Sequence, residues 1–439
     1  MNRRPWAYLV VVAAWLPPLA PMVPGRVHAA AWEVSPTALR DSLGPEPESV
    51  DSGPPEPVPI AGPAFDGDWL HTTGDDRLLS DPVDWRRRGG RLAELGPRFD
   101  YNRVDPLRLG LDYQIQDPRT RLPRLGARLE YATGRQVWLY GVQLEQPLAT
   151  GAGTAVGVSM ARATDHNRLQ QVDDFENSLA FLLGRQDYRD YFEREGFGGY
   201  FSTRVLGLST LSVELRNDRY RSLVARAGTP SWFHGGRDLR SNPPVVDGEA
   251  RTAAVRLERA PHPTPRPRAG LGHELELETA GGHLGGDFRY RRGLADVRAL
   301  VRTSPATTLA LRLVGGSGMA GDLPPQREFV AGGPDGLRAH SVSAFHGNQL
   351  VLMKAEYTVE LWHLHSGGFE GGLSAITFLD AGRAWNNPSH AWDIDAQRLA
   401  VDGGFGLGTA EDNLRVYFAK NLREPDSGFV ISARLRRPF

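Results

Sequence analysis

The residues with the clearest chemical potential lie in the segment GGPDGLRAH, residues 332–340, where glycines surround one arginine. Glycine lets a backbone turn sharply, and arginine is always protonated and offers a planar fork to carboxylates or phosphates. A Walker phosphate loop needs Lys and then Ser or Thr after its last glycine, whereas Leu337 and Arg338 follow Gly336 here. No helical period follows, so a dinucleotide-binding turn is also excluded. What Arg338 binds therefore depends on the rest of the chain.

Side chains that could take part in catalysis lie close to this loop and upstream of it. His340, Ser341, Ser343 and His346 cluster in sequence, and DYRDYF (187–192) groups two aspartates with aromatics. No G-x-S-x-G or H-E-x-x-H spacing accompanies them, so we do not expect an enzyme. Twelve scattered histidines without a cysteine form no metal-ligand pattern. Neither a metal nor a cofactor is expected.

The chain has 439 residues, no cysteine and a formal net charge of −1, which gives no support for a nucleic-acid partner. Residues 1–31 combine early arginines, an apolar run and small residues near the end, the pattern of a cleaved secretory signal peptide. Residues 32–97 are rich in proline and lack clear periodicity, which predicts a largely disordered periplasmic segment. The folded domain is therefore expected in residues 98–439.

Alternation of apolar and polar residues begins near Leu107 and recurs to the C-terminus. In residues 350–361, for example, apolar side chains at every second position oppose Lys354, Glu356 and Glu360. A period of two indicates antiparallel strands with one polar face, in a soluble sandwich or in a barrel. The polar faces carry charges of both signs, and short and long connections alternate. These features favour a transmembrane β-barrel, with a soluble secreted β-protein as the alternative.

The alternation predicts fifteen strands. They lie near residues 107–116, 122–131, 136–147, 152–162, 195–206, 208–218, 250–259, 270–281, 286–303, 306–315, 348–360, 370–382, 402–409, 413–421 and 428–439. Single-chain bacterial barrels have an even number of strands, so a sixteenth is expected, and its predicted place is 175–192. The same residues are compatible with a short amphipathic helix. The fold class is therefore all-β, an antiparallel barrel of about 16 strands with twelve or fourteen as alternatives.

Connections and the C-terminus add two expectations. The long loops at 219–249, 316–346 and 383–400 should share one side of the membrane. The chain ends in GFVISARLRRPF, whose apolar face resembles the C-terminal signal that outer-membrane barrels present to their assembly machinery. The predicted signal residues are Phe429, Ile431, Leu435 and Phe439.

Three successive segments resemble the C-terminal barrel of the BamA/TamA superfamily, also called the bacterial surface antigen family. The segments read REFVAGGPDGLRAH, NQLVLMKAEYTVEL and GLSAITFLDAGRAW. The family combines a glycine-rich loop ending in an arginine motif, an apolar strand with a central glutamate, and a strand with the pattern F-x-D-x-G. The matching residues here are Gly332, Gly333, Gly336, Leu337, Arg338, Glu356, Phe378, Asp380 and Gly382.

The resemblance implies that this loop lies between barrel strands 11 and 12 and folds into the lumen, where Arg338 pairs with Glu356 and Asp380. The sequence departs from the family where Ala339 and His340 replace a glycine and an aromatic residue. Relatives carry periplasmic POTRA domains, but the segment upstream of the barrel is too short and too rich in proline for one. The resemblance therefore indicates a member without POTRA domains.

For function, the resemblance implies an outer-membrane barrel of a Gram-negative-type bacterium. Such a barrel would aid assembly, insertion or translocation of outer-membrane components through a lateral seam between its first and last strands. A passive pore or a structural barrel without client activity is the alternative. The expected partners are outer-membrane lipid, the outer-membrane assembly machinery and client proteins or lipids, with no nucleic acid among them.

Overall fold

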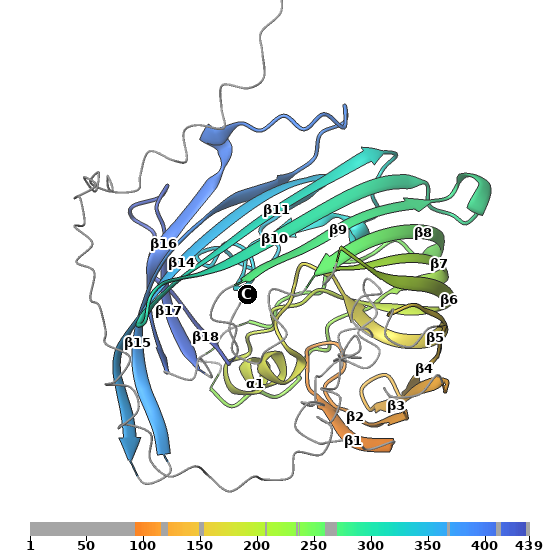
Figure 1. Cartoon of the computed structure of the whole chain (residues 1–439), viewed down its shortest axis with the longest axis horizontal. Coiled ribbons are helices and arrows are strands. Elements are labelled where there is room, and N and C mark those ends of the chain that lie inside the picture. The colour runs from red at the N-terminus through yellow and green to blue at the C-terminus, as the bar shows by residue number, and fades with distance from the viewer. Residues whose placement is uncertain are drawn as a thin grey trace, which may run out of the picture. The chain divides into compact units, whose positions relative to one another are not determined.

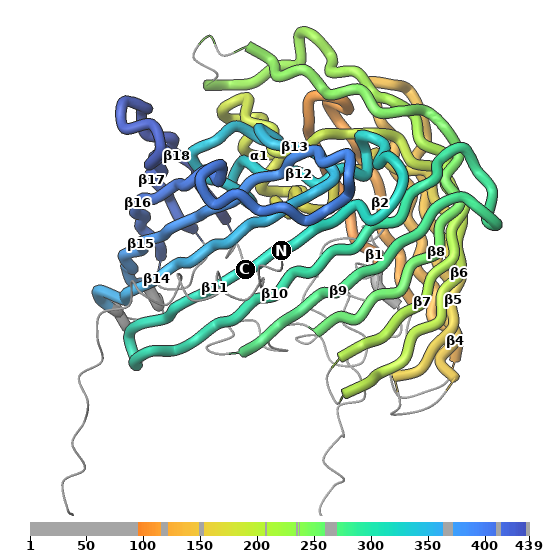
Figure 2. The backbone as a smooth tube through the Cα atoms, turned by 90° about the horizontal axis from the view of Figure 1, so that it is seen from above, coloured from red at the N-terminus to blue at the C-terminus, as the bar shows by residue number. Residues whose placement is uncertain are grey.

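The computed structural model describes residues 93–115, 122–148, 153–206, 209–233, 236, 238–259, 270–366, 369–409 and 414–435. These residues form one antiparallel sheet of sixteen strands that curls around a common interior (Figures 1 and 2). The strands are β1 (Ala93–Asp100), β2 (Arg108–Ile115), β3 (Arg124–Ala132), β4 (Val137–Pro147), β5 (Ala155–His166), β6 (Tyr191–Val205), β7 (Ser209–Ser222), β8 (Gly248–Arg259), β9 (Gly270–Ala280), β10 (Tyr290–Ser304), β11 (Thr307–Ala320), β14 (Gln349–Ser366), β15 (Phe369–Trp385), β16 (Ala400–Thr409), β17 (Arg415–Asn421) and β18 (Val430–Arg434).

Smaller elements lie in the connections. The helix α1 (Asp174–Gly184) joins β5 to β6, and a two-stranded sheet of β12 (Phe329–Ala331) and β13 (Phe345–Gly347) lies between β11 and β14 in the chain. Single turns of 3-10 helix occupy Gly282–Leu284, Pro325–Arg327 and Ala396–Arg398. Within the described residues, no helix is both long and apolar enough to cross a membrane.

The order of strands in the large sheet follows the chain, from β1 to β11 and then from β14 to β18. All fifteen strands predicted from the period of two are present, as β2 to β11 and β14 to β18. The all-β fold class and the count of sixteen strands are therefore confirmed. The loop that carries Arg338 follows the eleventh strand of the large sheet, β11, and precedes the twelfth, β14.

The predicted position of the sixteenth strand is wrong. Residues 175–192 begin with α1, because Asp173 caps the helix by accepting a hydrogen bond from the Phe175 N–H (3.0 Å). The sixteenth strand is β1, which begins five residues before the expected start of the barrel at residue 98. Pro97 interrupts the apolar pattern of β1, and proline within a sheet is confined largely to edge strands.

The wall of the sheet places apolar side chains outside and charged ones inside. Leu129, Leu277 and Leu313 are 50–57% exposed, whereas the adjacent Glu130, Glu276 and Arg312 are each 3% exposed. A soluble protein of this size would bury its large apolar side chains and expose its charges. An apolar outer face around a charged interior is the arrangement of a transmembrane β-barrel, which identifies the fold class.

The long connections all leave one end of the sheet. Those at 223–247, 321–348 and 386–399 follow the seventh, eleventh and thirteenth strands of the sheet, as the odd-numbered strands of an antiparallel order must. The α1 connection, 167–190, follows the fifth strand and leaves at the same end. The interior at this end holds an apolar cluster that includes Phe329, Leu337 and Leu350, and this cluster positions the arginine loop.

Candidate functional site: the arginine loop and the seam

The loop between β12 and β13 depends on its glycines for its path. Gly332 and Gly333 have φ angles of 123° and 75°, a region that side chains other than hydrogen rarely allow. A Cβ atom on Gly336 would lie 2.5 Å from the backbone nitrogen of Gly332, so this position also has no room for a side chain. Leu337 is fully buried in the apolar cluster of the interior. The loop is thus folded tightly and anchored beside Arg338.

Arg338 lies against the inner wall between two carboxylates. Its Nη1 donates to Glu356 Oε2 (3.0 Å) on β14, and its Nη2 donates to Asp380 Oδ1 (3.4 Å) on β15. Its Nε also lies 3.0 Å from Asp380 Oδ2, but these atoms are not aligned for a hydrogen bond, so this contact is an ion pair. All three side chains are at most 1% exposed. The structure therefore brings together the arginine and both of its predicted carboxylates.

Two aromatic rings complete the surroundings of the guanidinium group. The Arg338 Cζ atom lies 4.1 Å from the centroid of the Phe378 ring and 4.5 Å from that of Tyr417. Phe378 belongs to the predicted strand motif, whereas Tyr417, on β17, was not predicted as a site residue. Aromatic faces attract a cation most strongly where water is excluded. The two rings thus add to the attraction of the two carboxylates.

Glu356 has further partners that sequence reasoning missed. The Arg415 Nη1 and the Tyr417 hydroxyl, both on β17, donate to its carboxylate, the latter at 3.1 Å. Alternation along β17 places Arg415 and Tyr417 on the inner face, so their inward orientation can be predicted from the sequence. Their contact with Glu356 cannot be predicted, because β14 and β17 are separated by two other strands.

The position at which the loop departs from the family pattern makes its own contacts. The backbone N–H of Ala339 donates to Asp402 Oδ2 (2.7 Å) on β16, and His340 Nδ1 lies 3.0 Å from Asp402 Oδ1. The hydrogen bond with Asp402 raises the pKa of His340 above its usual value. The His340 ring also lies 5.2 Å from the ring of Phe345. His340 thus lies beside an aromatic ring, and it also pairs with Asp402 through a side chain that can be protonated.

Two more contacts extend the loop across the last strands. Lys354 Nζ on β14 donates to the carbonyl oxygen of Pro334 (3.1 Å), and Asp335 Oδ1 accepts from Arg434 Nη1 on β18 (2.9 Å). Together with the contacts of Arg338, Ala339 and His340, these bonds join the loop to every strand from β14 to β18. The arrangement can therefore hold the last five strands of the wall in a fixed relation to one another.

The remaining residue of the strand motif has a packing reason to be glycine. A Cβ atom on Gly382 would lie 2.5 Å from the carbonyl oxygen of Val351 on the neighbouring strand. The close approach of β14 and β15 at this point helps to place Glu356 and Asp380 side by side on the inner face.

The place where the first and last strands of the sheet face each other without pairing is called the seam below. β1 and β18 are the two ends of the strand order, and the described residues contain no pairing between them. The predicted C-terminal residues Phe429 and Ile431 are 58% and 56% exposed, and Leu435 is half-buried. Phe439 lies outside the described residues. Among the described residues, β1 and β18 thus each pair with a neighbouring strand on one side only. The open edge of such a strand can pair with a further strand.

The residues considered for catalysis contact separate carboxylates. His340 binds Asp402, Ser343 Oγ donates to Asp190 Oδ2 (2.6 Å), and His346 Nδ1 lies 2.7 Å from Glu328 Oε2. The aspartates of the DYRDYF segment pair with arginines of the interior, as Asp190 does with Arg103 and Arg240. In the described part of the chain, no group of histidine and acidic residues is arranged to hold a metal.

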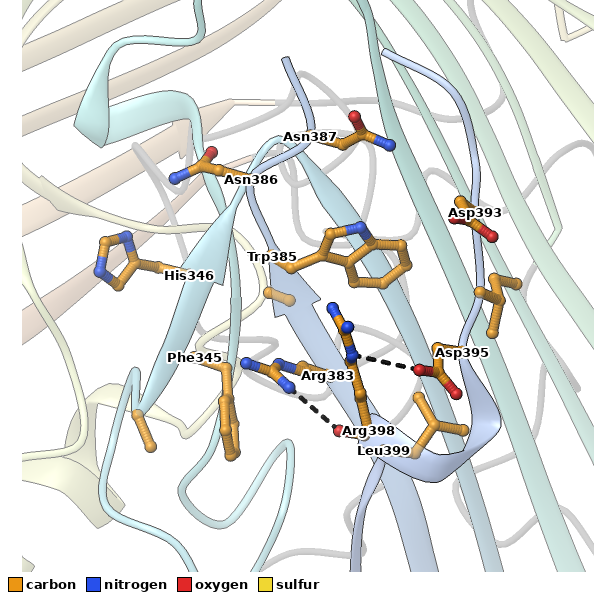
Figure 3. A pocket seen from close by; sticks show the side chains of 13 residues that line it. Phe345, His346, Arg383, Trp385, Asn386, Asn387, Asp393, Asp395, Arg398 and Leu399 are labelled. Atoms are coloured by element: carbon orange, nitrogen blue, oxygen red, sulfur yellow. Dashed lines mark hydrogen bonds and ion pairs between the residues drawn. The ribbon is translucent and has the colours of Figure 1, made fainter. Parts of the chain in front are cut away.

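A cavity of about 570 Å³ lies at the rim, between the end of β15 and the connection from β15 to β16 (Figure 3). Arg383 Nη1 donates to the carbonyl oxygen of Arg398 (3.3 Å), and the Arg398 guanidinium pairs with Asp395 at 3.1 Å. Asp393 completes the charged lining, which thus carries two arginines and two aspartates. This balance selects neither an anionic nor a cationic ligand.

The curled sheet, its apolar outer wall and the arginine loop inside it define a transmembrane barrel with a lumenal anchor loop. Residues 260–427 match the model of the Omp85 superfamily domain, a stretch that contains β9 to β17 and the loop. The resemblance seen in the three motifs is thus confirmed for this part of the chain, which contains an Omp85 superfamily domain. Barrels of this superfamily are bacterial outer-membrane proteins.

Three solved structures are similar to this chain at 12–13% sequence identity. The structure of BamA from Haemophilus ducreyi lacking POTRA domains 1–3 matches with a TM-score of 0.52 and 13% identity, covering 78% of this chain and 70% of that one. CdiB from Acinetobacter baumannii matches with a TM-score of 0.43 and 13% identity, over 78% of this chain and 59% of that one. CdiB from Escherichia coli gives 0.45 and 12%, over 79% and 63%. Of these three, the BamA structure has a score high enough to support the fold. No curated protein matches the chain.

Proposed function

We propose that this barrel aids the insertion or translocation of other outer-membrane components through the seam between β1 and β18. The observation that carries the proposal is that each of these strands pairs with one neighbour only among the described residues. A strand edge presents unpaired N–H and C=O groups, and an incoming extended segment can satisfy them by adding to the sheet. Pro97 on β1 fits an edge position, because proline cannot donate a hydrogen bond to a neighbouring strand.

The arginine loop supports the same function from inside the wall. By joining β14 to β18, it would keep the last five strands together when the seam widens. The strands would then separate at the seam, where β1 and β18 share no backbone hydrogen bonds. The hydrogen bonds between neighbouring strands from β14 to β18 would stay intact. In this proposal Arg338, Glu356 and Asp380 support the seam but contact no client.

The expected surroundings fit the proposal. The outer wall exposes apolar side chains to outer-membrane lipid, and residues 1–31 have the pattern of an export signal. Phe429, Ile431, Leu435 and Phe439 would present this chain to the assembly machinery during its own insertion. Client proteins or lipids would then meet the seam from the periplasm or from the membrane.

Reconstitution into liposomes tests the proposal. A small outer-membrane barrel unfolded in urea is diluted into liposomes that contain this protein, and its folding is followed by protection from protease. The proposal predicts faster folding than in liposomes with an equal amount of a barrel whose first and last strands are paired. Equal folding rates, together with a steady ion conductance through this protein, would instead support a passive pore.

A further inference from the structure

The helix α1 lies between β1 and β18 in both views of the molecule (Figures 1 and 2). Its first turn carries Asp174 and Glu176, whose negative charges are favourable at the N-terminus of a helix. The side chains of these two residues point to opposite sides of the seam. Asp174 contacts the β1 side, and Glu176 contacts β18.

Toward β1, the helix is held by several bonds. Asp174 Oδ2 pairs with Arg98 Nη2 (2.8 Å), and Arg98 is a residue of β1. Ser178 Oγ accepts from the N–H of Tyr101 (2.9 Å) and donates to Asp100 Oδ1 (2.8 Å). The helix is therefore attached to β1 and to the residues that follow it.

The helix is also bonded to the start of β6 and to the segment that leads into it, and the residues before and after the helix contact the connection between β11 and β14. Asn177 is fully buried, donates to the Tyr191 hydroxyl (2.9 Å) and accepts from the N–H of Tyr188 (2.8 Å). β6 belongs to the same half of the wall as β1. A movement of β1 away from β18 would thus carry the helix with it.

Toward β18, the helix reaches with one carboxylate. Glu176 Oε1 pairs with Arg434 Nε at 2.6 Å, and the side chains are 3% and 4% exposed. Arg434 also pairs through Nη1 with Asp335 of the arginine loop (2.9 Å). One buried guanidinium group on β18 is thus shared by two carboxylates, one from α1 and one from the loop that holds the last strands.

We propose that α1 is a latch on the seam, joined to β18 through the ion pair of Glu176 with Arg434 and released when that pair breaks. The inference rests on the proposed function of the seam and specifies how its opening is controlled. Breaking a buried ion pair is costly when a charge is left without a partner. Here Arg434 keeps Asp335 when Glu176 withdraws, so the last strand does not lose its buried counter-ion on opening.

Spin labels across the seam test the latch without a client. The chain contains no cysteine, so cysteines placed at Leu95 on β1 and Ile431 on β18 can be labelled selectively. Both side chains face outward and are 63% and 56% exposed. Pulsed EPR then reports the distance between the strands in detergent or lipid. In Glu176→Gln, the ratio of the wide to the narrow population should rise about five-fold, because glutamine keeps an acceptor oxygen but loses the charge that strengthens the hydrogen bond.

Matched variants separate the latch from a general loosening of the wall. Glu145→Gln neutralises a carboxylate that is 1% exposed and pairs with Arg124 between β3 and β4, away from α1 and β18, and it should leave the distribution unchanged. Labels at Leu95 and Leu215 of β7 report the unbroken wall and should show one distance in every variant. Arg434→Gln should widen the seam as Glu176→Gln does, and the two changes together should add little.

The outcomes distinguish the latch from the function on which it rests. Distributions in Glu176→Gln and Arg434→Gln that superimpose on that of the wild type, with the wall labels unchanged, would reject the latch alone. A seam that widens in both variants, in a protein that does not accelerate client folding, would keep the latch and reject the proposed function. If Glu176→Gln disturbs the wall labels, Glu176→Asp, which keeps the charge but shortens the side chain, should still widen the seam.

Discussion

Replacing Arg338 by alanine is expected to lower the free energy of unfolding by about 3–5 kcal/mol, the usual cost of removing one partner of a buried ion pair. The side chains of Arg338, Glu356 and Asp380 are at most 1% exposed, so water screens their attraction little. Glu356 keeps Arg415 and Tyr417 in the variant, whereas Asp380 loses its ion-pair partner in the loop. The loss should therefore come mainly from Asp380 and from the two aromatic faces, each worth about 0.5–2 kcal/mol.

Urea unfolding in detergent micelles measures this change, and protease cleavage within residues 332–344 measures the loosening of the loop. Arg338→Lys should recover part of the loss, because a point charge cannot bridge two carboxylates as a planar fork does. Arg398→Ala is the matched control, since Arg398 is 75% exposed and its removal should cost about 0–1 kcal/mol. In a cycle with Asp380→Asn, the two effects should fail to add by more than about 0.5 kcal/mol. Simple additivity with wild-type protease resistance would refute the reasoning.

Three further predictions concern the ends, the sidedness and the pH response of the barrel. Deletion of Phe439 should lower outer-membrane levels in fractionated cells whereas Phe439→Tyr should not, and normal levels of the deletion would exclude an assembly signal there. Cysteines at Ser241 and Ser389 in the long connections should react with an impermeant maleimide on intact cells, and one at Ala306 in the opposite turn should not. A reversed pattern would contradict the topology. Because the Asp402 hydrogen bond raises the pKa of His340, its stabilisation is complete below about pH 6.5 and is lost as the pH rises through the folded-state pKa. Unfolding free energies of the wild type and His340→Gln should thus converge at alkaline pH, and a constant difference would contradict this.

Most of the wall could be predicted from the sequence, because inward and outward residues alternate. Leu313 beside Arg312, and Leu277 beside Glu276, already show an apolar and a charged face on successive residues. β1 was missed because Pro97 and its neighbouring glycine interrupt this pattern within a proline-rich stretch. Residues 175–192 were misjudged because short apolar runs fit a strand and a helix equally, and the cap at Asp173 decides between them.

The site was predictable only where motif and period coincide. Glu356 and Asp380 could be placed beside Arg338 because both fall on the inner faces of adjacent strands. Tyr417 and Arg434 could not, because their contacts depend on how far the sheet curls. The position of α1 across the seam likewise follows from tertiary contacts of Glu176 with a residue 258 positions later in the chain.

Locking the seam tests the central claim most directly. Cysteines at Leu95 and Ile431 are joined by a cleavable bifunctional thiol reagent, and folding of the unfolded client barrel is measured in liposomes before and after cleavage. The account predicts that the locked protein accelerates folding no more than empty liposomes do, and that cleavage restores the acceleration. A locked protein that supports client folding at the rate of the unlocked one would show that the seam between β1 and β18 is not the route.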